Sequence, residues 1–506
     1  MDMWKALLFY GTIFLLIFAI CTNSLHYDYD LWARLIAGMG VIDGGGVLKS
    51  DFLSYTPVHT WYDHEWGSGV VFYAFLKYLG PYSLIVLESL LYFGIFFVIS
   101  KIIELRTQKH AYNIIFYIFP IIAVAENFNN PIRCHLFSFL FFTIFIYILE
   151  LARQGKNKPL YLIPIFTIIW NNLHGGVVAG LGLLVMYAVG EILNRKPFKK
   201  YLITLAITAP TLIINPWGCD YIKFLLSANT MERPDILEWW GIFSKYHLFG
   251  FIPFKLFMLW IIGIEFVALV KNKTVNFIQW WNNLDKTKYI LLFTTLYLAI
   301  TKVKLIPFFI ITGTIFVYED FYSLISKIKF PEWKNKVLYA VLISMTLFSL
   351  AIKDISIPVN FEAYPVKEIE FIKINNLKGR LLVNFGIGSY AAYKLYPNNV
   401  IFMDGRYEEV YYDGMIPLLK KFYLVLPYWE EILDRFPPDL MIIENDYPIY
   451  DVLKKSNIWV NVFNGKRYGV FVRKKNLRND YKLPTDNINY YRDTLFDTDI
   501  KFKKRV

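Results

Sequence analysis

Two acidic and aromatic stretches flank the region that follows the first apolar segment of the chain. They read His26-Tyr27-Asp28-Tyr29-Asp30-Leu31-Trp32 and Trp61-Tyr62-Asp63-His64-Glu65-Trp66. A carboxylate at a membrane surface can act as a general base when its surroundings tune its pKa. Several acids with a histidine can instead hold a divalent cation against a phosphate group. The same residues are equally compatible with solvated loop positions and helix N-caps.

Basic and histidine residues lie at the ends of later apolar segments. Pro131-Ile132-Arg133-Cys134-His135 opens one segment, and Trp170-Asn171-Asn172-Leu173-His174-Gly175-Gly176 joins two others. Ionisable residues at membrane depth usually face a cavity or a polar partner. Arg133 suits a phosphate because a guanidinium binds two oxygens at once. His135 and His174 could neutralise a phosphate or bind metal, although a structural role is the more common fate of a single histidine.

A further basic pair, Lys302 and Lys304, interrupts two apolar runs. Such a pair at a helix end can attract a lipid-linked phosphate, and snorkelling of both lysines to lipid headgroups explains it equally well. The loop with Glu232-Arg233-Pro234-Asp235 and Glu238-Trp239-Trp240 can be a mobile lid or an interfacial aromatic belt. The belt is the favoured interpretation.

Nearer the C-terminus, Asp404-Gly405-Arg406 follows a predicted strand, where open α/β sheets often place ligand contacts. Asp404 and Arg406 can bind a ligand or form a salt bridge that fixes the turn. Gly386-Ile387-Gly388 is too short a signal for a dinucleotide loop. A Walker motif, a GxSxG elbow and an HExxH motif are all missing from the sequence, so ATP-driven transport and zinc proteolysis have no support.

The composition points to a membrane protein as the framework for these residues. Of the 506 residues, 56% are hydrophobic and 19% are charged. The hydrophobic share is higher, and the charged share lower, than in an ordinary soluble domain. Disorder, a coiled coil and a collagen-like rod are excluded by hydrophobicity and by the lack of repeats. Three cysteines form neither a disulfide framework nor a CxxC knuckle. The net charge of +12 arises largely from short loops between apolar runs, so it indicates membrane topology and not nucleic-acid binding.

The apolar segments predict about eleven transmembrane helices, because a bilayer core requires around 20 mostly apolar residues per helix. The predicted spans are 4–21, 82–100, 112–126, 133–151, 160–172, 175–193, 201–215, 251–270, 289–301, 305–323 and 337–352. Lysine and arginine gather in alternate loops, which the positive-inside rule assigns to the cytoplasm. The N-terminus is then cytoplasmic, and a long first outer loop covers 22–66. An odd number of helices places the chain after residue 352 outside.

The last third of the chain predicts a small α/β domain. The predicted strands are Arg380–Asn384, Val400–Asp404, Leu440–Glu444, Val460–Phe463 and Gly469–Arg473, and helices are expected near 386–396, 414–424, 428–435 and 448–455. Asn464-Gly465 predicts a hairpin turn between the last two strands. The basic tail after Arg473 is expected to be solvated. We therefore predict a transmembrane domain over 1–352 and an extracytoplasmic α/β domain over 353–506.

This arrangement resembles the type-C glycosyltransferases (GT-C), membrane enzymes that use polyprenyl-phosphate-linked sugars. The resemblance is to an uncharacterised prokaryotic subgroup, and together its motifs span most of the chain. They are Asp30-Leu31-Trp32, Asp51-Phe52-Leu53-Ser54-Tyr55-Thr56, Trp61 with His64-Glu65-Trp66, Asn172-Leu173-His174-Gly175-Gly176, and Asp404-Gly405-Arg406. In that superfamily a first-loop aspartate is the catalytic base or a metal ligand. Asp30 matches that position best, and Asp28 is the next candidate.

The resemblance implies inverting transfer of a sugar from a polyprenyl phosphate or diphosphate to a glycan, lipid or protein acceptor. The expected catalytic residues are Asp30, Asp28, Glu65 and His64. The expected substrate-binding residues are Asp63, Arg133, His135, Asn172, His174, Lys302 and Lys304. An optional Mg or Mn ion would use Asp30, Asp63, His64 and Glu65.

We expect a multi-pass protein of the plasma or inner membrane, in contact with membrane lipids and not with nucleic acid. Two other functions stay open. A transporter or flippase for a lipid or polar solute would use the same outer cavity without chemistry, and paired inverted repeats would be expected of it. A non-catalytic membrane scaffold would present its outer domain and would make the first-loop acids dispensable.

Overall fold

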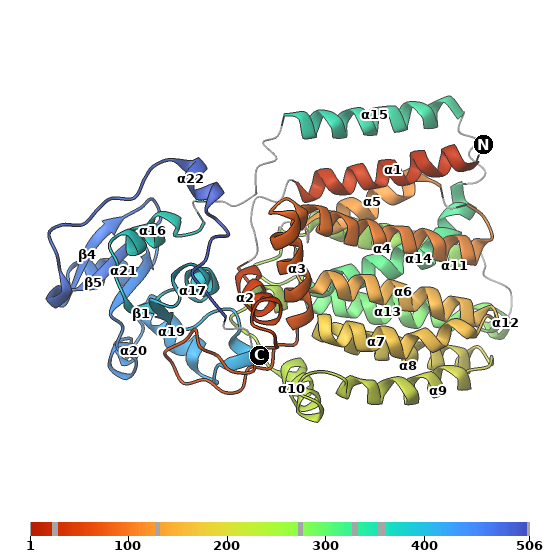
Figure 1. Cartoon of the computed structure of the whole chain (residues 1–506). Coiled ribbons are helices and arrows are strands. Elements are labelled where there is room, and N and C mark those ends of the chain that lie inside the picture. The colour runs from red at the N-terminus through yellow and green to blue at the C-terminus, as the bar shows by residue number, and fades with distance from the viewer. Residues whose placement is uncertain are drawn as a thin grey trace. The chain divides into compact units, whose positions relative to one another are not determined.

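The computed structural model describes residues 2–22, 29–110, 112–126, 132–271, 277–325, 332–352, 361 and 363–502. It is mostly helical, with a small sheet in the C-terminal region (Figure 1). The chain divides into two compact units. Unit 1 contains Met1–Leu25 and Ile85–Ser356, and unit 2 contains His26–Leu84 and Ile357–Val506. The sequence grouped 22–66 with the membrane helices, whereas in the folded chain His26–Leu84 packs with the C-terminal region.

Unit 1 is a helical bundle. A helix lies in each of the eleven predicted apolar segments. These helices are α1 (Asp2–Cys21), α4 (Ser83–Thr107), α5 (Ile114–Ala125), α6 (His135–Arg153), α7 (Leu162–Leu173), α8 (Val178–Leu193), α9 (Lys199–Thr208), α11 (Ile252–Lys271), α13 (Lys286–Thr301), α14 (Ile306–Ile325) and α15 (Glu332–Ala351). Shorter elements are α10 (Cys219–Thr230), α12 (Phe277–Asn283) and the 3-10 turns η2 (Lys158–Tyr161), η3 (Gly175–Val177), η4 (Ala209–Ile213), η5 (Leu237–Trp239) and η6 (Val303–Leu305).

Six helices in the described part of the chain are long and apolar enough to cross a membrane. They cover Met3–Cys21, Ser83–Thr107, His135–Arg153, Gly175–Leu193, Ile252–Lys271 and Val303–Ile325. Large apolar side chains also face outward on the bundle, and Phe266 and Phe293 are each 66% exposed. Water disfavours such a surface, whereas lipid accommodates it. These features indicate a multi-pass membrane protein.

A buried network of ion pairs joins four helices of unit 1. Arg153 on α6 lies 2.9 Å from Glu191 of α8 and 2.8 Å from Asp285 at the start of α13. Arg106 on α4 lies 2.7 Å from Glu150 of α6. Because buried charges require partners, this network fixes the relative positions of helices that share only weakly directional apolar contacts.

Unit 2 contains a five-stranded sheet in the order β2-β1-β3-β5-β4. The strands are β1 (Gly379–Leu382), β2 (Asn399–Ile401), β3 (Leu440–Glu444), β4 (Trp459–Asn464) and β5 (Tyr468–Arg473). The first three are parallel, and β5 and β4 continue the sheet in antiparallel pairing. All five predicted strands are confirmed within a few residues. The predicted hairpin is also confirmed, with Gly465 N donating to Tyr468 O at 2.9 Å.

Short helices surround this sheet. They are α16 (Val366–Ile374), η7 (Phe385–Ile387), α17 (Gly388–Leu395), α18 (Tyr407–Val410), α19 (Met415–Tyr423), α20 (Glu431–Arg435), α21 (Pro448–Lys454), η8 (Lys474–Asn476) and α22 (Ile488–Asp493). The expectation of a solvated tail is wrong for the residues around α22. Leu495 and Ile500 are buried, and Lys394 Nζ donates to the carbonyls of Thr494 and Asp497. Apolar burial and carbonyl bonding therefore hold this segment against the domain.

The region between the first apolar segment and α4 is more regular than expected. It contains α2 (Leu31–Ile42) and α3 (Trp66–Leu79), which cross so closely that a Cβ on Gly38 would overlap the backbone carbonyl of Gly69. The connecting segment runs beside β2, where Tyr55 N donates to Ile401 O at 3.0 Å and Ile401 N to Leu53 O at 2.8 Å. The region is thus an integral part of the fold of unit 2.

Candidate functional site

A buried group of charges in unit 2 centres on Arg34 of α2. We call it the acid cluster; its members are Arg34, Asp63, His64, Glu65, Glu408 and Glu409. The Arg34 guanidinium forms an ion pair with Asp63 and donates to both oxygens of Glu409 at 2.9 and 3.0 Å. Its Nε lies 3.5 Å from Glu65. One fork-shaped cation therefore organises three carboxylates.

His64 supplies the second positive charge of the acid cluster. Its Nδ1 lies 3.1 Å from Glu409, and its Nε2 lies 3.7 Å from Glu65 and 4.0 Å from Glu408. Burial alone would lower the pKa of His64, but Glu65, Glu409 and Glu408 raise it to about 9. The imidazole is therefore protonated at neutral pH.

The carboxylates of the acid cluster differ in proton affinity. Burial raises the pKa of Asp63 to about 6, with Arg34 opposing the rise and Glu409 adding to it. Burial also opposes ionisation of Glu409, yet Arg34 and His64 lower its pKa to about 2. The Oδ2 atom of Asp63 is buried and lacks a hydrogen-bond partner among the described residues. Asp63 is thus more easily protonated than Glu409, which is held as an anion.

A second buried network fixes the turn Asp404-Gly405-Arg406. Arg406 Nε donates to the Asp404 carboxylate at 2.9 and 3.0 Å, and its Nη1 donates to Asp51 at 2.6 Å. Tyr411 adds a hydrogen bond to Asp404 at 3.3 Å. The side chains of Arg406, Asp404 and Asp51 are all fully buried. Of the two roles left open for Asp404 and Arg406, the structure shows the salt bridge.

Asp30 occupies the N-cap position of α2, without a cap bond from its side chain. Its Oδ1 lies 2.5 Å from the point that a Cβ on Gly405 would occupy, so residue 405 must be glycine for the carboxylate to lie there. Asp30 is partly exposed, as are His64, Glu65 and Glu408, whereas Arg34, Asp63 and Glu409 are buried. Asp28 lies outside the described residues.

His64, Glu65 and Glu409 form a group that could hold a metal ion, because their ligand atoms lie within 4.8 Å of one another. Asp30 and Asp63, which the sequence suggested as ligands, are not in this group of described residues. Nitrogen and carboxylate ligands suit Mn²⁺ or Zn²⁺ better than Mg²⁺. An ion here would have to replace the His64 proton and share Glu409 with Arg34, so the fit is conditional on pH.

Unit 1 contains a different group of charged residues, most of them cations. We call it the anion cluster, after the kind of ligand that such cations attract. Its members are Arg133, Arg233, Glu238, Trp239, Lys302 and Lys304. Arg133 Nη1 donates to Glu238 at 2.6 Å, and Lys304 Nζ lies 3.9 Å from the same carboxylate. Burial would raise the pKa of Glu238, but Arg133 and Lys304 lower it to about 2. Glu238 is therefore an anion surrounded by cations.

Three cations surround the ring of Trp239. The centroid lies 4.0 Å from the Arg233 guanidinium carbon, 4.4 Å from Lys302 Nζ and 3.5 Å from Lys304 Nζ. Cation–π attraction holds positive charge over an indole face. The backbone fixes this arrangement, since Val303 N donates to Trp240 O at 3.0 Å. The loop that the sequence described as a lid or belt thus lies against the lysine pair.

Lys302 is the least satisfied cation of this group. In the part of the chain that the structure describes, its ammonium contacts the Trp239 ring and has no hydrogen-bond acceptor. Burial lowers the pKa of Lys302, and the positive charge of Arg233 lowers it further. An anion bound at this position would relieve both effects.

The remaining predicted residues have defined surroundings in unit 1. His135 lies within electrostatic reach of Arg133, Glu238 and Lys304, so it belongs at the edge of the anion cluster. His174 Nδ1 is bonded to Ser138 Oγ at 2.7 Å and accepts from Gly176 N at 2.9 Å. Asn172 Nδ2 donates to the carbonyls of Ile168 and Ile214. The contacts of His174 and Asn172 are those of residues that secure helix ends.

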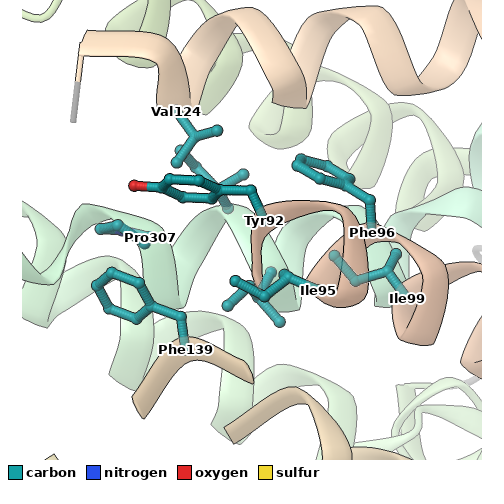
Figure 2. Close-up of a pocket in the computed structure, with 9 residues that line it drawn as sticks. Tyr92, Ile95, Phe96, Ile99, Val124, Phe139 and Pro307 are labelled. Atoms are coloured by element: carbon teal, nitrogen blue, oxygen red, sulfur yellow. The ribbon is translucent and has the colours of Figure 1, made fainter. Parts of the chain in front are cut away.

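A narrow apolar pocket begins one helical turn from the anion cluster (Figure 2). Side chains of α4, α5, α6 and α14 line it. Phe139 follows His135 by one turn on α6, and Pro307 follows Lys304 by three residues. Tyr92 and Phe96 of α4 complete the aromatic lining that Figure 2 shows. Residues of the anion cluster and residues that line the apolar pocket therefore follow one another along α6 and at the start of α14.

Several members of both clusters were missed by sequence reasoning. Arg34, Glu408 and Glu409 carry no local signal, because the partners of each are distant in the chain. Arg233, Glu238 and Trp239 were noticed only as parts of a loop. The interruption of two apolar runs by Lys302 and Lys304 was the signal that located the anion cluster.

No family model matches this chain, and no curated protein matches its sequence.

Proposed function

We propose that this chain is a membrane glycosyltransferase of the GT-C type. It moves a sugar from a polyprenyl phosphate or diphosphate to an extracytoplasmic acceptor. The observation that carries the proposal is the anion cluster with Arg133, Lys302 and Lys304, because Lys304 lies three residues before Pro307, which lines an apolar pocket. A polyprenyl phosphate has the same two parts, an anionic head and an apolar chain. Such a ligand needs cations beside an apolar surface at the ends of membrane helices.

The cations of unit 1 have a catalytic use in this proposal. In the reaction, an acceptor oxygen attacks the anomeric carbon, and the bond between that carbon and the phosphate oxygen breaks. Negative charge develops on the departing phosphate, where Arg133, Lys302 and Lys304 stabilise it. Inversion at the anomeric carbon follows from a single displacement. The acceptor loses one proton in the step, so the enzyme must supply a base.

Asp30 is the proposed base. It is partly exposed, whereas Asp63 is buried and His64 and Glu65 are ion-paired within the acid cluster. A general base must reach the proton that it removes, and a buried ion-paired carboxylate such as Asp63 lacks that access. Accordingly, we propose that the acid cluster either stabilises the conformation of the segment that carries Asp30 or orients the acceptor.

A divalent cation bound at the acid cluster would use His64, Glu65 and Glu409. It would supply Lewis-acid polarisation of an acceptor oxygen. Chelation should then abolish transfer, Mn²⁺ should restore it, and Glu65→Gln should prevent the restoration. Transfer that survives exhaustive chelation would contradict this assignment and leave the base mechanism intact.

The proposed topology has eleven membrane crossings, a cytoplasmic N-terminus and an extracytoplasmic α/β domain in the plasma or inner membrane. The loop charges support it, because basic residues concentrate in alternate connections. Cysteine accessibility scanning tests the orientation. The new thiol of Lys156→Cys should react from the cytoplasmic side and that of Asp446→Cys from the outer side.

The experiment that tests the function is sugar transfer by the purified chain in lipid nanodiscs. Radiolabelled polyprenyl-phosphate and polyprenyl-diphosphate sugars serve as donors, and total membrane glycolipid serves as acceptor. We compare the wild type with Asp30→Asn and with Asp446→Asn, an exposed aspartate of the same unit. Transfer or hydrolysis should be lost in Asp30→Asn and retained in Asp446→Asn.

The alternatives predict other results. A lipid transporter or flippase moves the donors across the bilayer without breaking the sugar–phosphate bond, equally in all three proteins. A scaffold neither binds nor moves them. Full turnover by Asp30→Asn would contradict the base assignment, and the absence of turnover with any donor would favour the transporter or the scaffold.

A further inference from the structure

The last described residues of the chain lie along α2. Phe496 contacts Trp32 in the first turn of α2, with 5.6 Å between the two ring centroids. Phe502 lies just beyond the other end of α2, where a Cβ on Gly44 would come within 2.9 Å of the Phe502 Cβ. Figure 1 shows the chain after α22 passing α17 on its way to the C-terminus. We call residues 494–502 the strap.

The strap and α2 are matched in length. Trp32 and Gly44 lie about 18 Å apart along the helix direction, at a rise of 1.5 Å per residue. The chain from Phe496 to Phe502 spans about 20 Å when it is extended. An extended strap therefore reaches from one end of α2 to the other with little slack.

A buried lysine of α17 fastens the strap. Lys394 Nζ donates to the carbonyls of Thr494, Leu495 and Asp497 at 2.6, 3.3 and 2.8 Å. Lys394 is only 6% exposed. A buried ammonium group requires acceptors, so the loss of these three bonds would be costly. The start of the strap is therefore clamped to α17.

Tyr393, the neighbour of this lysine, adds two more bonds. Tyr393 Oη donates to Phe496 O at 2.7 Å, and Thr498 Oγ1 donates to Tyr393 O. The Tyr393 ring also lies 5.2 Å from the Trp32 ring. The same residue of α17 thus holds the strap and contacts the first turn of α2.

Trp32 is the side chain through which the strap acts on α2. It is fully buried, and the rings of Tyr390, Tyr393 and Phe496 lie 4.8, 5.2 and 5.6 Å from its own. Of these three rings, two belong to α17 and the third to the strap. Because Trp32 is two residues from Asp30, its packing fixes the turn of backbone that carries the Asp30 carboxylate.

We propose that the strap is a positioning element for Asp30, in which Lys394 fastens the strap and Phe496 holds Trp32 in place. The inference rests on the proposed function, because it concerns the base of that reaction. Displacement of a reacting group by about 1 Å is enough to lower a rate a hundredfold. Lys394 and Phe496 act on the rate only through the position of Asp30.

Three variants of the full chain in nanodiscs test the proposal by sugar transfer. Phe496→Ala removes the contact with Trp32 and should lower kcat roughly tenfold to a hundredfold, with KM for the donor nearly unchanged. Phe496→Leu keeps an apolar contact and should recover most of that loss. Tyr481→Ala is the matched control and should change neither constant. Tyr481 is a half-buried aromatic residue of the same C-terminal segment, and it packs on Phe371 of α16.

Hydrogen exchange measures the same effect without any reaction. In Phe496→Ala, the amides of residues 31–36 should exchange at least roughly tenfold faster than in wild type, whereas those of β3 should keep their rates. Lys394→Met releases the three carbonyls of the strap and should give the same pattern. Lys454→Met, at an exposed lysine of α21, should leave all of these rates unchanged.

Three results would overturn the proposal. They are unchanged exchange in α2 of Phe496→Ala, an equal loss of kcat in Phe496→Ala and Tyr481→Ala, and a kcat of Phe496→Leu as low as that of Phe496→Ala. The strap and the enzyme fail separately. Faster exchange in α2 of Phe496→Ala, without sugar transfer by wild type, keeps the strap and removes the glycosyltransferase. Sugar transfer with a kcat that Phe496→Ala leaves unchanged keeps the enzyme and removes the positioning role.

Discussion

The indole nitrogen of Trp61 donates a hydrogen bond of 2.8 Å to Glu409, a residue 348 positions away in the chain. Trp61 also makes a cation–π contact, because the centroid of its ring lies 4.6 Å from the guanidinium carbon of Arg406. Trp61 therefore connects the acid cluster to the Asp404–Arg406 turn. A single buried side chain contacts both charge networks of unit 2.

This relationship predicts the effect of Trp61→Phe. Phenylalanine keeps an aromatic face for Arg406 but cannot donate to Glu409, and a lost hydrogen bond to a buried charge costs about 1.5–3 kcal/mol. We expect the apparent melting temperature of unit 2 to fall by several degrees in thermal unfolding of the solubilised chain. Trp429→Phe, at a partly buried tryptophan of the same unit, is the control and should have a smaller effect. Equal effects would show that ring volume, and not the indole N–H, is what matters.

The protonated His64 predicts a dependence of stability on pH. Neighbouring carboxylates raise the pKa of His64 from 6.5 to about 9, so the folded state binds the proton more tightly than the unfolded state does. The stabilisation is complete below pH 6.5 and is lost as the pH rises through about 9, with an upper bound on the order of 3 kcal/mol. Wild type should lose this stability between pH 7 and pH 10, and His64→Gln should not. His59→Gln, at a partly exposed histidine of unit 2, should behave as wild type does.

The close crossing of α2 and α3 predicts that Gly38→Ala is poorly tolerated. The added methyl group would overlap the carbonyl oxygen of Gly69, which belongs to the backbone and cannot move aside as a side chain can. The expected loss is roughly 1–3 kcal/mol or more, with faster hydrogen exchange in α2. Gly263→Ala in α11 meets no atom within 4 Å and should be neutral. Slow exchange in α2 of Gly38→Ala would mean that the helices separate without cost.

The buried network among α4, α6, α8 and α13 predicts a large effect of Arg153→Gln. Removing the cation leaves the buried Glu191 and the partly exposed Asp285 with fewer partners, and breaking a buried pair such as Arg153–Glu191 costs roughly 3–5 kcal/mol. The solubilised variant should unfold at markedly lower temperature than wild type. Lys199→Gln removes an exposed charge of the same unit and should change little. A neutral Arg153→Gln would indicate that water or lipid headgroups replace the arginine.

Elements with local patterns were predictable, and those that depend on distant partners were not. The strands of unit 2 combine buried β-branched residues with turn signals such as Asn464-Gly465, so their positions could be read within a few residues. By contrast, α2 was not predicted, because it lies within the segment 22–66 that was interpreted as a loop. It is short, and acidic and aromatic residues on both sides dominated the pattern.

The same distinction applies to the charge clusters. Arg133, Lys302 and Lys304 could be identified because a charge at the end of an apolar segment is conspicuous in itself. No residue near Arg34 in the sequence indicates that Glu409, 375 positions away, binds it. Glu238 and Trp239 reach the lysine pair only through the backbone hydrogen bond between Trp240 and Val303. This is a tertiary contact that no local pattern predicts.

The bonds of Arg34 have a consequence for how the chain is made. Arg34 emerges early in synthesis, but Glu409 is translated 375 residues later. At roughly 5–20 residues per second, the interval is on the order of half a minute. During that time the guanidinium and the closely crossed α2 and α3 exist without the domain that completes them. Biogenesis must therefore tolerate an unfinished unit 2, and a nascent chain that stops short of residue 409 cannot complete it.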